Sequence, residues 1–326
     1  MASLTLEKLK QFYAELWRIR LFEGYVQRLT GQGEIPGFPH LSTGQEAVAV
    51  GVCANLARGD YLFSGHRAHG HVLAKGSDPY ATFAEVLGRR DGLCRGRGGS
   101  MHLVDAANGV MGATGVVAGN LPLAAGAAFA AMERGDGRIA AVFFGDGATG
   151  AGVFHETLNL AGLWQLPLLF ICENNGYAEF TSRAEHSNVA KVSAFAAPYA
   201  IPAQTIDGND VLTVHEAARE AVEQLRSGGG PRLLECMTYR MAGHFVGDAQ
   251  RYRPKEEIAA MKEKDPIDRL RRHLVEQGAA GSELEDIAAR VKADLEVIVE
   301  RARRAPRPDP ATVLDYVYSA ARMTRG

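Results

Sequence analysis

The hydrophobic pattern in the middle of the chain predicts a strand, a helix and a second strand in succession. An apolar run covers residues 139–144 and stops at Gly145-Asp146-Gly147, as a buried strand that reaches a turn does. Residues 151–165 carry apolar side chains at helical spacing, and a second apolar run, 166–172, stops at Glu173-Asn174-Asn175-Gly176. Such a unit joins two parallel neighbouring strands by a right-handed crossover.

Similar patterns predict further elements on both sides of this unit. Apolar side chains at helical spacing over residues 5–29 predict an amphipathic helix whose stripe packs on the core. Residues 114–132 are rich in Gly and Ala, which favours a helix packed closely against other helices. Downstream we expect a strand and turn at 204–211, a helix at 214–224, a strand at 231–240, and helices at 256–264, 266–277, 282–304 and 313–323. Ser282 and Glu285 have the spacing of a capping box.

The order of these elements indicates an α/β fold, with a mostly parallel sheet and helices on both of its faces. With 326 residues, 46% of them hydrophobic, the chain can bury one large core or two modest ones. We assign residues 1–255 to a ligand-binding domain. Residues 256–326, where the density of charge rises, are assigned to a helical C-terminal extension.

Composition and charge narrow the setting in which the protein works. A formal net charge of −2 gives no electrostatic reason to expect nucleic acid or an anionic membrane as a partner. No apolar run approaches the ~20 residues that a membrane-spanning helix needs, and the start, MASLTLEKLK, lacks the features of a secretory signal. Four scattered cysteines without a C-x-x-C pair indicate neither a zinc site nor a disulfide framework. We therefore expect a soluble protein in the reducing cytoplasm.

The two turns that follow the central strands carry the chemistry. In open α/β sheets ligands bind at the carboxyl ends of the strands, so Asp146 and Asn175 are expected side by side. A carboxylate, an amide oxygen and a main-chain carbonyl form an all-oxygen set, which suits Mg²⁺ or Ca²⁺ carrying a diphosphate. Glycines at 145, 147 and 150 allow backbone N–H groups to approach those phosphates at a helix N-terminus.

Two other interpretations of the same window remain open at this point. Residues 145–150 also read G-x-G-x-x-G between a strand and a helix, with the acidic Glu173 at the end of the next strand. That is the outline of a nicotinamide dinucleotide fingerprint. Asp-Gly and Asn-Asn-Gly are also common turn chemistry without any ligand.

Basic side chains gather in three other segments. One stretch contains His66, Arg67, His69 and His71. The histidines have no helical spacing and no thiolate beside them, which argues against a metal site. Arg67 is better interpreted as a clamp for a phosphate group. His40 lies in a Pro-rich loop, where a solvated histidine is equally plausible. The strand at 231–240 leads to a further group on the ligand edge, Arg240, His244 and Asp248. The loop GRGGSMH at 96–102 is suited either to a backbone nest for an anion or to a structural role.

GDG, 26 intervening residues and NN resembles the metal and diphosphate motif of thiamine-diphosphate enzymes. More specifically, residues 145–177 resemble the alpha subunit of the thiamine-dependent component of pyruvate, branched-chain 2-oxo acid and acetoin dehydrogenase complexes. The resemblance runs from about residue 20 to 270. It includes a Tyr-Arg-x-x-Gly-His pattern followed by Asp, which matches Tyr239, Arg240, Gly243, His244 and Asp248.

The resemblance implies a role for each matching position. Asp146, Asn175 and the Tyr177 carbonyl would hold Mg²⁺, and Arg67, Arg240 and the N–H groups of Gly147 and Ala148 would hold the diphosphate of thiamine diphosphate. Gly115 and Val117 match the segment that holds the aminopyrimidine ring. His66 stands where the family usually has a cofactor-binding tyrosine. His244 and His40 match the catalytic histidines, and an imidazole with a near-neutral pKa can exchange protons with a reacting carbonyl.

In the family the cofactor lies between two chains, and a partner glutamate activates its pyrimidine ring. The resemblance therefore implies a beta subunit, an α2β2 heterotetramer, and transfer of a two-carbon unit to a lipoyl-bearing acyltransferase. The segments GHFVGD and GEIPGFPHLSTGQEAVAVGV are closest to the acetoin branch, with pyruvate as the alternative small carbonyl substrate and branched-chain 2-oxo acids next. From other classes, a nicotinamide dehydrogenase and a non-catalytic binding module remain to be tested.

Overall fold

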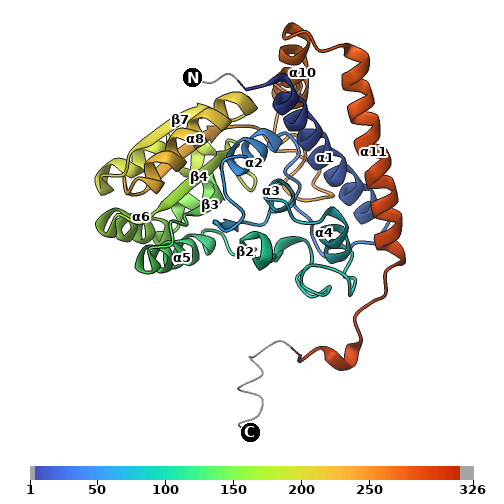
Figure 1. Cartoon of the computed structure of the whole chain (residues 1–326), viewed down its shortest axis with the longest axis horizontal. Helices are drawn as coiled ribbons and strands as arrows, with labels where there is room; N and C mark the ends of the chain where they lie inside the picture. Colours follow the sequence, from blue (N-terminus) through green and yellow to red (C-terminus); the bar gives the residue numbers. More distant parts are fainter. Residues whose placement is uncertain (1–3, 316–326) are drawn as a thin grey trace.

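The computed structural model describes residues 4–315 and contains one large sheet surrounded by helices (Figure 1). Its strands are β1 (Tyr61–Ser64), β2 (Val110–Ala113), β3 (Ala140–Gly145), β4 (Leu168–Asn174), β7 (Ala203–Asp207) and β8 (Arg232–Met237). They lie in the order β2-β1-β3-β4-β8-β7, and every neighbouring pair is parallel. The predicted α/β fold with a mostly parallel sheet is confirmed.

α-Helices and a small hairpin accompany the sheet. The helices are α1 (Leu6–Gly31), α2 (Glu46–Cys53), α3 (His69–Ala74), α4 (Pro79–Val86), α5 (Asn120–Arg134), α6 (Gly152–Trp164), α7 (Arg183–His186), α8 (Val211–Arg226), α9 (Lys255–Lys262), α10 (Pro266–Glu276) and α11 (Gly281–Arg304). β5 (Tyr177–Ala178) and β6 (Thr181–Ser182) form an antiparallel hairpin directly after β4.

Side-chain alternation along β3 shows why helices cover both faces of the sheet. Ala140, Val142 and Phe144 belong to the buried cluster that includes α5 and α6. Ala141 and Phe143 belong to the opposite cluster, with α2 and α8. Successive side chains of a strand point to opposite faces, so a strand buried on both faces reads as a continuous apolar run.

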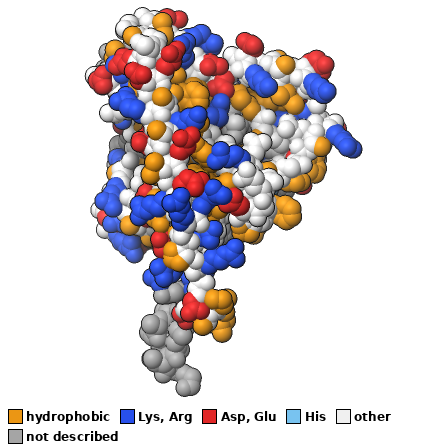
Figure 2. Space-filling view, turned by 90° about the vertical axis from the view of Figure 1, so that its right-hand side faces the viewer, with side chains coloured by type: hydrophobic (Ala, Val, Ile, Leu, Met, Phe, Trp, Pro, Cys, Tyr) orange, Lys and Arg blue, Asp and Glu red, His pale blue; other side chains and the backbone are white. Residues whose placement is uncertain are grey.

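A third cluster joins the two ends of the chain. In the predicted apolar stripe of α1, Leu9 and Leu16 are buried, whereas Trp17 and Leu21 are only partly buried. The stripe and Phe22 pack with α4, α10 and α11. Leu284 and Leu295 supply the buried side of α11, which runs alongside α1 in Figure 1. The outward surface of these C-terminal helices carries interspersed acidic and basic side chains (Figure 2). Within residues 4–315, no helix combines the length and apolar character required to cross a bilayer.

Several predicted boundaries need correction. The strand expected at 231–240 ends at Met237, and the helix expected from residue 114 begins at Asn120. The capping box at Ser282 and Glu285 was a wrong prediction: α11 begins at Gly281, Ala280 is its N-cap, and no side chain caps it. The described part of the helix predicted at 313–323, residues 313–315, is a turn, and residues 316–323 lie outside the described residues.

The strand order fixes where a ligand can bind. The chain passes from β1 outward to β2, then returns to place β3 on the other side of β1. The strand order therefore reverses between β1 and β3, and a crevice opens at the carboxyl ends of the strands at such a switch point. β1 is followed by Gly65-His66-Arg67, and β3 by a 3₁₀ turn, Asp146–Gly150.

Candidate active site

A cavity of about 350 Å³ lies at this edge of the sheet. Its walls include almost every residue that the sequence singled out: His40, His66, Arg67, Gly115, Val117, Gly147, Ala148, Asn175, Tyr177, Arg240 and His244. Among the residues to which the resemblance gives a role, Asp146 is the exception, because its side chain is completely buried while its neighbours Gly145 and Gly147 line the cavity. The fold thus brings together segments as distant in the chain as those of His40 and His244.

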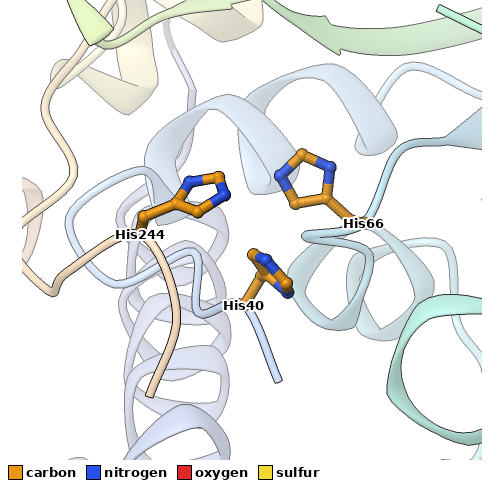
Figure 3. A group of neighbouring side chains, drawn as sticks. All are labelled: His40, His66 and His244. Carbon is orange, nitrogen blue, oxygen red and sulfur yellow. The ribbon is translucent and has the colours of Figure 1, made fainter. Parts of the chain in front are cut away.

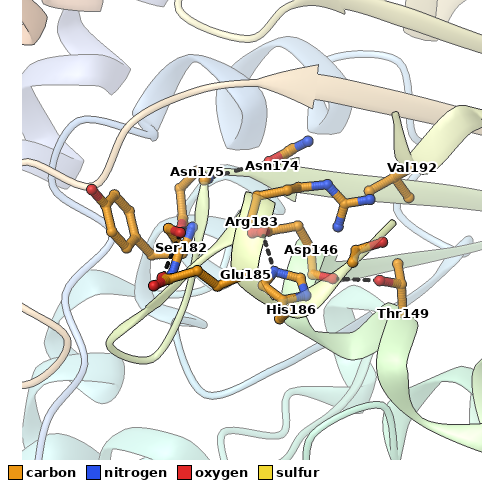
Figure 4. Close-up of polar contacts among 12 residues, drawn as sticks. Asp146, Thr149, Asn174, Asn175, Ser182, Arg183, Glu185, His186 and Val192 are labelled. Carbon is orange, nitrogen blue, oxygen red and sulfur yellow. Dashed lines mark hydrogen bonds and ion pairs between the residues drawn. The ribbon is translucent and has the colours of Figure 1, made fainter. Parts of the chain in front are cut away.

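Asp146 has one carboxylate oxygen paired and one unpaired. Gly145 pairs with Glu173 across β3 and β4, so the two turns start at the same level of the sheet. Asp146 Oδ2 lies 3.2 Å from His186 Nε2, whereas Oδ1 is buried without a hydrogen-bond partner (Figure 4). Burial raises the pKa of Asp146, and the neighbouring His186 partly opposes that rise. A buried, unpaired carboxylate oxygen is costly, and a bound cation would satisfy it.

Asn175 and Tyr177 are held next to this carboxylate by two sets of hydrogen bonds. The Asn175 amide donates from Nδ2 to Gln45 Oε1 at 3.0 Å and accepts at Oδ1 from the Tyr177 backbone N–H at 3.2 Å. The Tyr177 hydroxyl donates to the Glu257 carboxylate at 3.0 Å; burial together with this bond raises the pKa of Tyr177 to about 12. The Asp146 carboxylate, the Asn175 amide oxygen and the Tyr177 main-chain carbonyl form the hard oxygen donor set that Mg²⁺ prefers. These residues therefore fit the metal that the sequence implies.

Arg67 and Arg240 place two buried cations on one side of the cavity. Arg67 donates to the main-chain carbonyls of Leu41 at 2.7 Å and His244 at 2.8 Å. Arg240 donates to the Tyr252 hydroxyl at 2.7 Å. All these acceptors are neutral, and burial together with the charge of Arg240 lowers the pKa of Arg67 to about 9. Two guanidinium groups in this state would gain most from an anion, and a diphosphate supplies one.

Three histidines from separate segments meet at the cavity (Figure 3). The ring of His40 lies 4.7 Å from that of His66 and 4.9 Å from that of His244, measured between centroids. Burial and the charge of Arg67 lower the pKa of His40 to about 4, of His66 to about 2 and of His244 to about 3. The near-neutral pKa expected for His244 is therefore wrong for the chain as it stands, because its surroundings disfavour the charged ring.

The proton on His244 can be placed from its neighbours. Its Nδ1 lies 3.1 Å from a guanidinium nitrogen of Arg67 and 3.2 Å from one of Arg240. Guanidinium groups only donate, so Nδ1 accepts and the neutral ring carries its proton on Nε2. Asp248 fixes the loop by accepting the His244 backbone N–H at 2.6 Å and the Tyr252 hydroxyl at 2.8 Å.

The spacing of the three imidazoles alone would also suit a transition metal, since one nitrogen of each lies within 4.8 Å of the others. The adjacent guanidinium groups argue against this, because both contact His244 and would repel a divalent cation. The acidic and amide oxygens of Asp146 and Asn175 are the better cation site. The histidines instead face the region where an anion or a carbonyl compound would lie.

Sequence reasoning assigned no role to several residues in or beside the cavity wall. His71, whose Nε2 lies 3.2 Å from Glu173 Oε1, is also hydrogen-bonded through Nδ1 to Ser64 Oγ at 2.8 Å. Gln45 lines the wall as well. His186 belongs to α7, whose start carries a complete capping box of Ser182 and Glu185. That S-x-x-E signal could have revealed the helix from the sequence.

The glycine-rich loop at 96–102 does form an anion nest, but the anion belongs to the protein. The carboxylate of Glu85 accepts the backbone N–H groups of Cys94, Gly96, Gly98 and Gly99 at 2.7–3.1 Å. Glu85 is fully buried, and these bonds satisfy its charge. The loop therefore has a structural role beside the cavity.

Comparison with known proteins agrees with this geometry. The profile of the family described as "Dehydrogenase E1 component" matches residues 14–311. The alpha subunit of acetoin:2,6-dichlorophenolindophenol oxidoreductase from Bacillus subtilis is 46% identical over 317 residues, which cover 97% of this chain and 95% of the relative. The corresponding subunit from Cupriavidus necator is 45% identical, with 97% and 96% covered. The pyruvate dehydrogenase E1 component subunit alpha of Zymomonas mobilis is 43% identical, with 93% and 86% covered. This chain therefore belongs to the dehydrogenase E1 component family.

Proposed function

We propose that the chain is the alpha subunit of a thiamine-diphosphate-dependent acetoin dehydrogenase. The observation that carries the proposal is the cavity itself, where a buried unpaired oxygen of Asp146 adjoins a wall with two guanidinium groups that donate to neutral acceptors. A magnesium diphosphate complements both parts of the cavity, because its cation would bind the oxygens around Asp146 and its phosphates would bind the two arginines.

Each residue has a definite task in this proposal. Asp146, Asn175 and the Tyr177 carbonyl hold Mg²⁺. Arg67 and Arg240 hold the diphosphate, together with the N–H groups of the Asp146–Gly150 turn around Gly147 and Ala148. His66 stands at the place of the family's cofactor-binding tyrosine. Gly115 and Val117 support the aminopyrimidine ring. Holding the diphosphate at a helix start and between two arginines orients the cofactor without any covalent attachment.

When bound, thiamine diphosphate supplies a nucleophilic carbon and an electron sink for cleavage of a carbon–carbon bond beside a carbonyl. His244 presents its Nε2 proton toward the cavity, because Nδ1 is occupied by Arg67 and Arg240. It donates a hydrogen bond from Nε2 to the oxygen of the small carbonyl substrate or steers the lipoyl acceptor, and His40 lies close enough to share this role.

A second chain completes the site in this proposal. Val116 and Val117 line the cavity yet are 68% and 56% exposed, so a rim that should enclose a cofactor is open on that side. The relatives are named as alpha subunits. We therefore propose a beta subunit that supplies the remaining wall and the activating glutamate, an α2β2 heterotetramer, and a lipoyl-bearing acyltransferase as acceptor of the two-carbon unit.

The setting is proposed to be the cytoplasm, with a ligand-binding domain at 1–255 and a helical extension at 256–326. Cys53, Cys94, Cys172 and Cys236 are all free thiols, and three of them are buried. Unpaired cysteines are typical of proteins in a reducing compartment.

Pyruvate is the second candidate substrate, favoured by the 43% identity to a pyruvate dehydrogenase alpha subunit. Acetoin is preferred because the two relatives at 46% and 45% identity are named for it. A branched-chain 2-oxo acid ranks behind both. A nicotinamide dehydrogenase would leave the unpaired oxygen of Asp146 without a function.

The test measures, by calorimetry with and without Mg²⁺, the binding of thiamine diphosphate to the chain co-purified with its beta subunit. The proposal predicts saturable binding that EDTA abolishes and Mg²⁺ restores. Binding of NAD in the presence of EDTA, with none of thiamine diphosphate, would support a nicotinamide dehydrogenase instead. Binding of neither would leave a non-catalytic binding module as the better interpretation.

A further inference from the structure

Gln45 contacts the proposed metal ligand Asn175, and both side chains line the cavity. Gln45 is 1% exposed and comes from the start of α2 rather than from the strand ends. Its Oε1 accepts the Asn175 amide at 3.0 Å. Its Nε2 is buried and has no hydrogen-bond partner. Burying an amide N–H₂ group without a hydrogen-bond acceptor is unfavourable, so a ligand atom that accepts from Gln45 Nε2 would stabilise this arrangement.

The orientation of both amides follows from one group that cannot be reversed. The backbone N–H of Tyr177 is a donor only, so the Asn175 atom that it contacts at 3.2 Å must be the oxygen, Oδ1. Asn175 Nδ2 then faces Gln45, whose contacting atom must be the acceptor, Oε1. Gln45 Nε2 is therefore the atom left over. Reversing either amide would bring two donors into contact.

The backbone around Gln45 is held rigidly. Gly44 has φ +98°, and a Cβ at this position would lie 2.4 Å from the main-chain oxygen of Tyr239. The Glu46 carboxylate accepts the Gly44 N–H at 3.0 Å and forms an ion pair with Arg20. The N–H of Met241 donates to Thr43 O at 2.9 Å. Gln45 is thus fixed between α1, α2 and the segment after β8.

We infer that Gln45 is a positioning residue for the metal and diphosphate site, and this inference rests on the proposed function. Its Oε1 fixes the Asn175 amide with Oδ1 available to the cation. Its Nε2 donates to a phosphate oxygen of the bound magnesium diphosphate. A hydrogen bond to a charged oxygen is stronger than one between neutral groups, so loss of this donor weakens cofactor binding more than it weakens the fold.

The experiment measures thiamine diphosphate and Mg²⁺ binding by calorimetry in the co-purified alpha and beta chains. Gln45→Met keeps the length of the side chain and removes both polar atoms, whereas Gln45→Glu keeps an acceptor for Asn175 and removes the donor. We expect the Kd for thiamine diphosphate to rise about ten- to a hundredfold in both variants. The thermal midpoint of the cofactor-free complex should change little in Gln45→Met.

A matched control lies just beyond the other end of the same helix. Asn55 donates from Nδ2 to the main-chain oxygens of Gly51 and His215, each at 3.0 Å, and does not line the cavity. Asn55→Ala should lower the thermal midpoint and leave both Kd values unchanged. A double-mutant cycle of Gln45→Met with Asn175→Ala should be non-additive for Mg²⁺, because the two side chains act as a pair.

The outcomes separate this inference from the function on which it rests. If the wild-type complex binds thiamine diphosphate but Gln45→Met binds it within twofold of wild type, the role of Gln45 is refuted while the function stands. Additive effects on Mg²⁺ would refute the action through Asn175. Absence of magnesium-dependent binding by the wild-type complex would overturn the proposed function and the inference together.

Discussion

His186 Nε2 lies 3.2 Å from Asp146 Oδ2, while the second oxygen of the same buried carboxylate has no partner. The imidazole comes from the short helix after the β5–β6 hairpin and the carboxylate from the turn after β3. The pairing leaves Oδ1 free for a cation and orients the carboxylate before any cation arrives. It is the arrangement expected of a metal ligand rather than of a turn residue.

Asp146→Asn should therefore separate stability from binding. Burial raises the pKa of Asp146, which means that its charge is disfavoured in the folded chain without a metal. The variant should keep or slightly raise the thermal midpoint of the cofactor-free protein and weaken magnesium-dependent cofactor binding about a hundredfold or more. Calorimetry and thermal unfolding on the same samples check this. Normal binding by the variant would show that Asp146 is not a metal ligand.

His244→Ala should impair turnover while the metal and cofactor still bind. The ring lies against Arg67 and Arg240, but these arginines keep their other contacts with Leu41 O and the Tyr252 hydroxyl. Loss of a positioned proton donor typically slows the chemical step by about 10²–10⁴-fold. The measurement is single-turnover acylation of lipoamide beside a cofactor titration. Loss of cofactor affinity as large as the loss of rate would argue for a binding role instead.

Gly44→Ala should destabilise the fold. At φ +98° an L side chain is strained, and the new Cβ would meet the Tyr239 main-chain oxygen. The cost should be on the order of 1–3 kcal/mol, measured by urea unfolding. Gly24→Ala is the control, because Gly24 lies within α1 with nothing within 4 Å of its Cβ position, and it should be neutral or stabilising. Equal effects of the two substitutions would contradict this account of the turn.

The cavity histidines predict a dependence of stability on pH. His40, His66 and His244 have pKa values of about 4, 2 and 3 in the folded chain, below the ordinary value of 6.5. The unfolded chain therefore binds protons below pH 6.5 that the folded chain excludes. The free energy of unfolding of the cofactor-free protein should be greatest above pH 6.5 and fall as the pH drops toward 4.

His66→Gln should reduce the loss of stability at low pH, because the unfolded variant has one fewer histidine to protonate. Urea unfolding at pH 7.5 and pH 5 gives the comparison. Gly24→Ala on α1, which changes no titratable group and lies outside the cavity, is the control and should keep the wild-type difference between the two pH values. A wild-type stability that does not change between these pH values would contradict the depressed pKa values.

The sequence was most informative where an apolar run, which predicts a buried strand, ended in a turn motif, which predicts a ligand site. The central unit of β3, α6 and β4 was predicted because its strands are buried on both faces and end in Gly-Asp-Gly and Asn-Asn-Gly. Parallel pairing of the two strands then placed Asp146 and Asn175 at one edge. The strand β1 and the helix α2 were missed. β1 has only four residues, and α2 is buried on all sides, so neither shows a period.

Contacts between distant segments set the limit of what the sequence could predict. His71 and Glu173 are 102 residues apart, and Asn175 and Gln45 are 130 apart. Neither pair has a local signal, because each depends on how helices from the first third of the chain pack on the strand ends. The same holds for the pKa of His244, which burial and Arg67 lower together.

The most direct test of the proposed activity is turnover by the co-purified alpha and beta chains with thiamine diphosphate, Mg²⁺ and 2,6-dichlorophenolindophenol as electron acceptor. Acetoin, pyruvate and a branched-chain 2-oxo acid are assayed in parallel, with the Asp146→Asn complex as the inactive control. The account predicts that acetoin reduces the dye and that pyruvate does so much more slowly. Turnover of pyruvate or the branched-chain acid without acetoin would contradict the assignment of the substrate, and dye reduction by the Asp146→Asn complex at the wild-type rate would contradict the site.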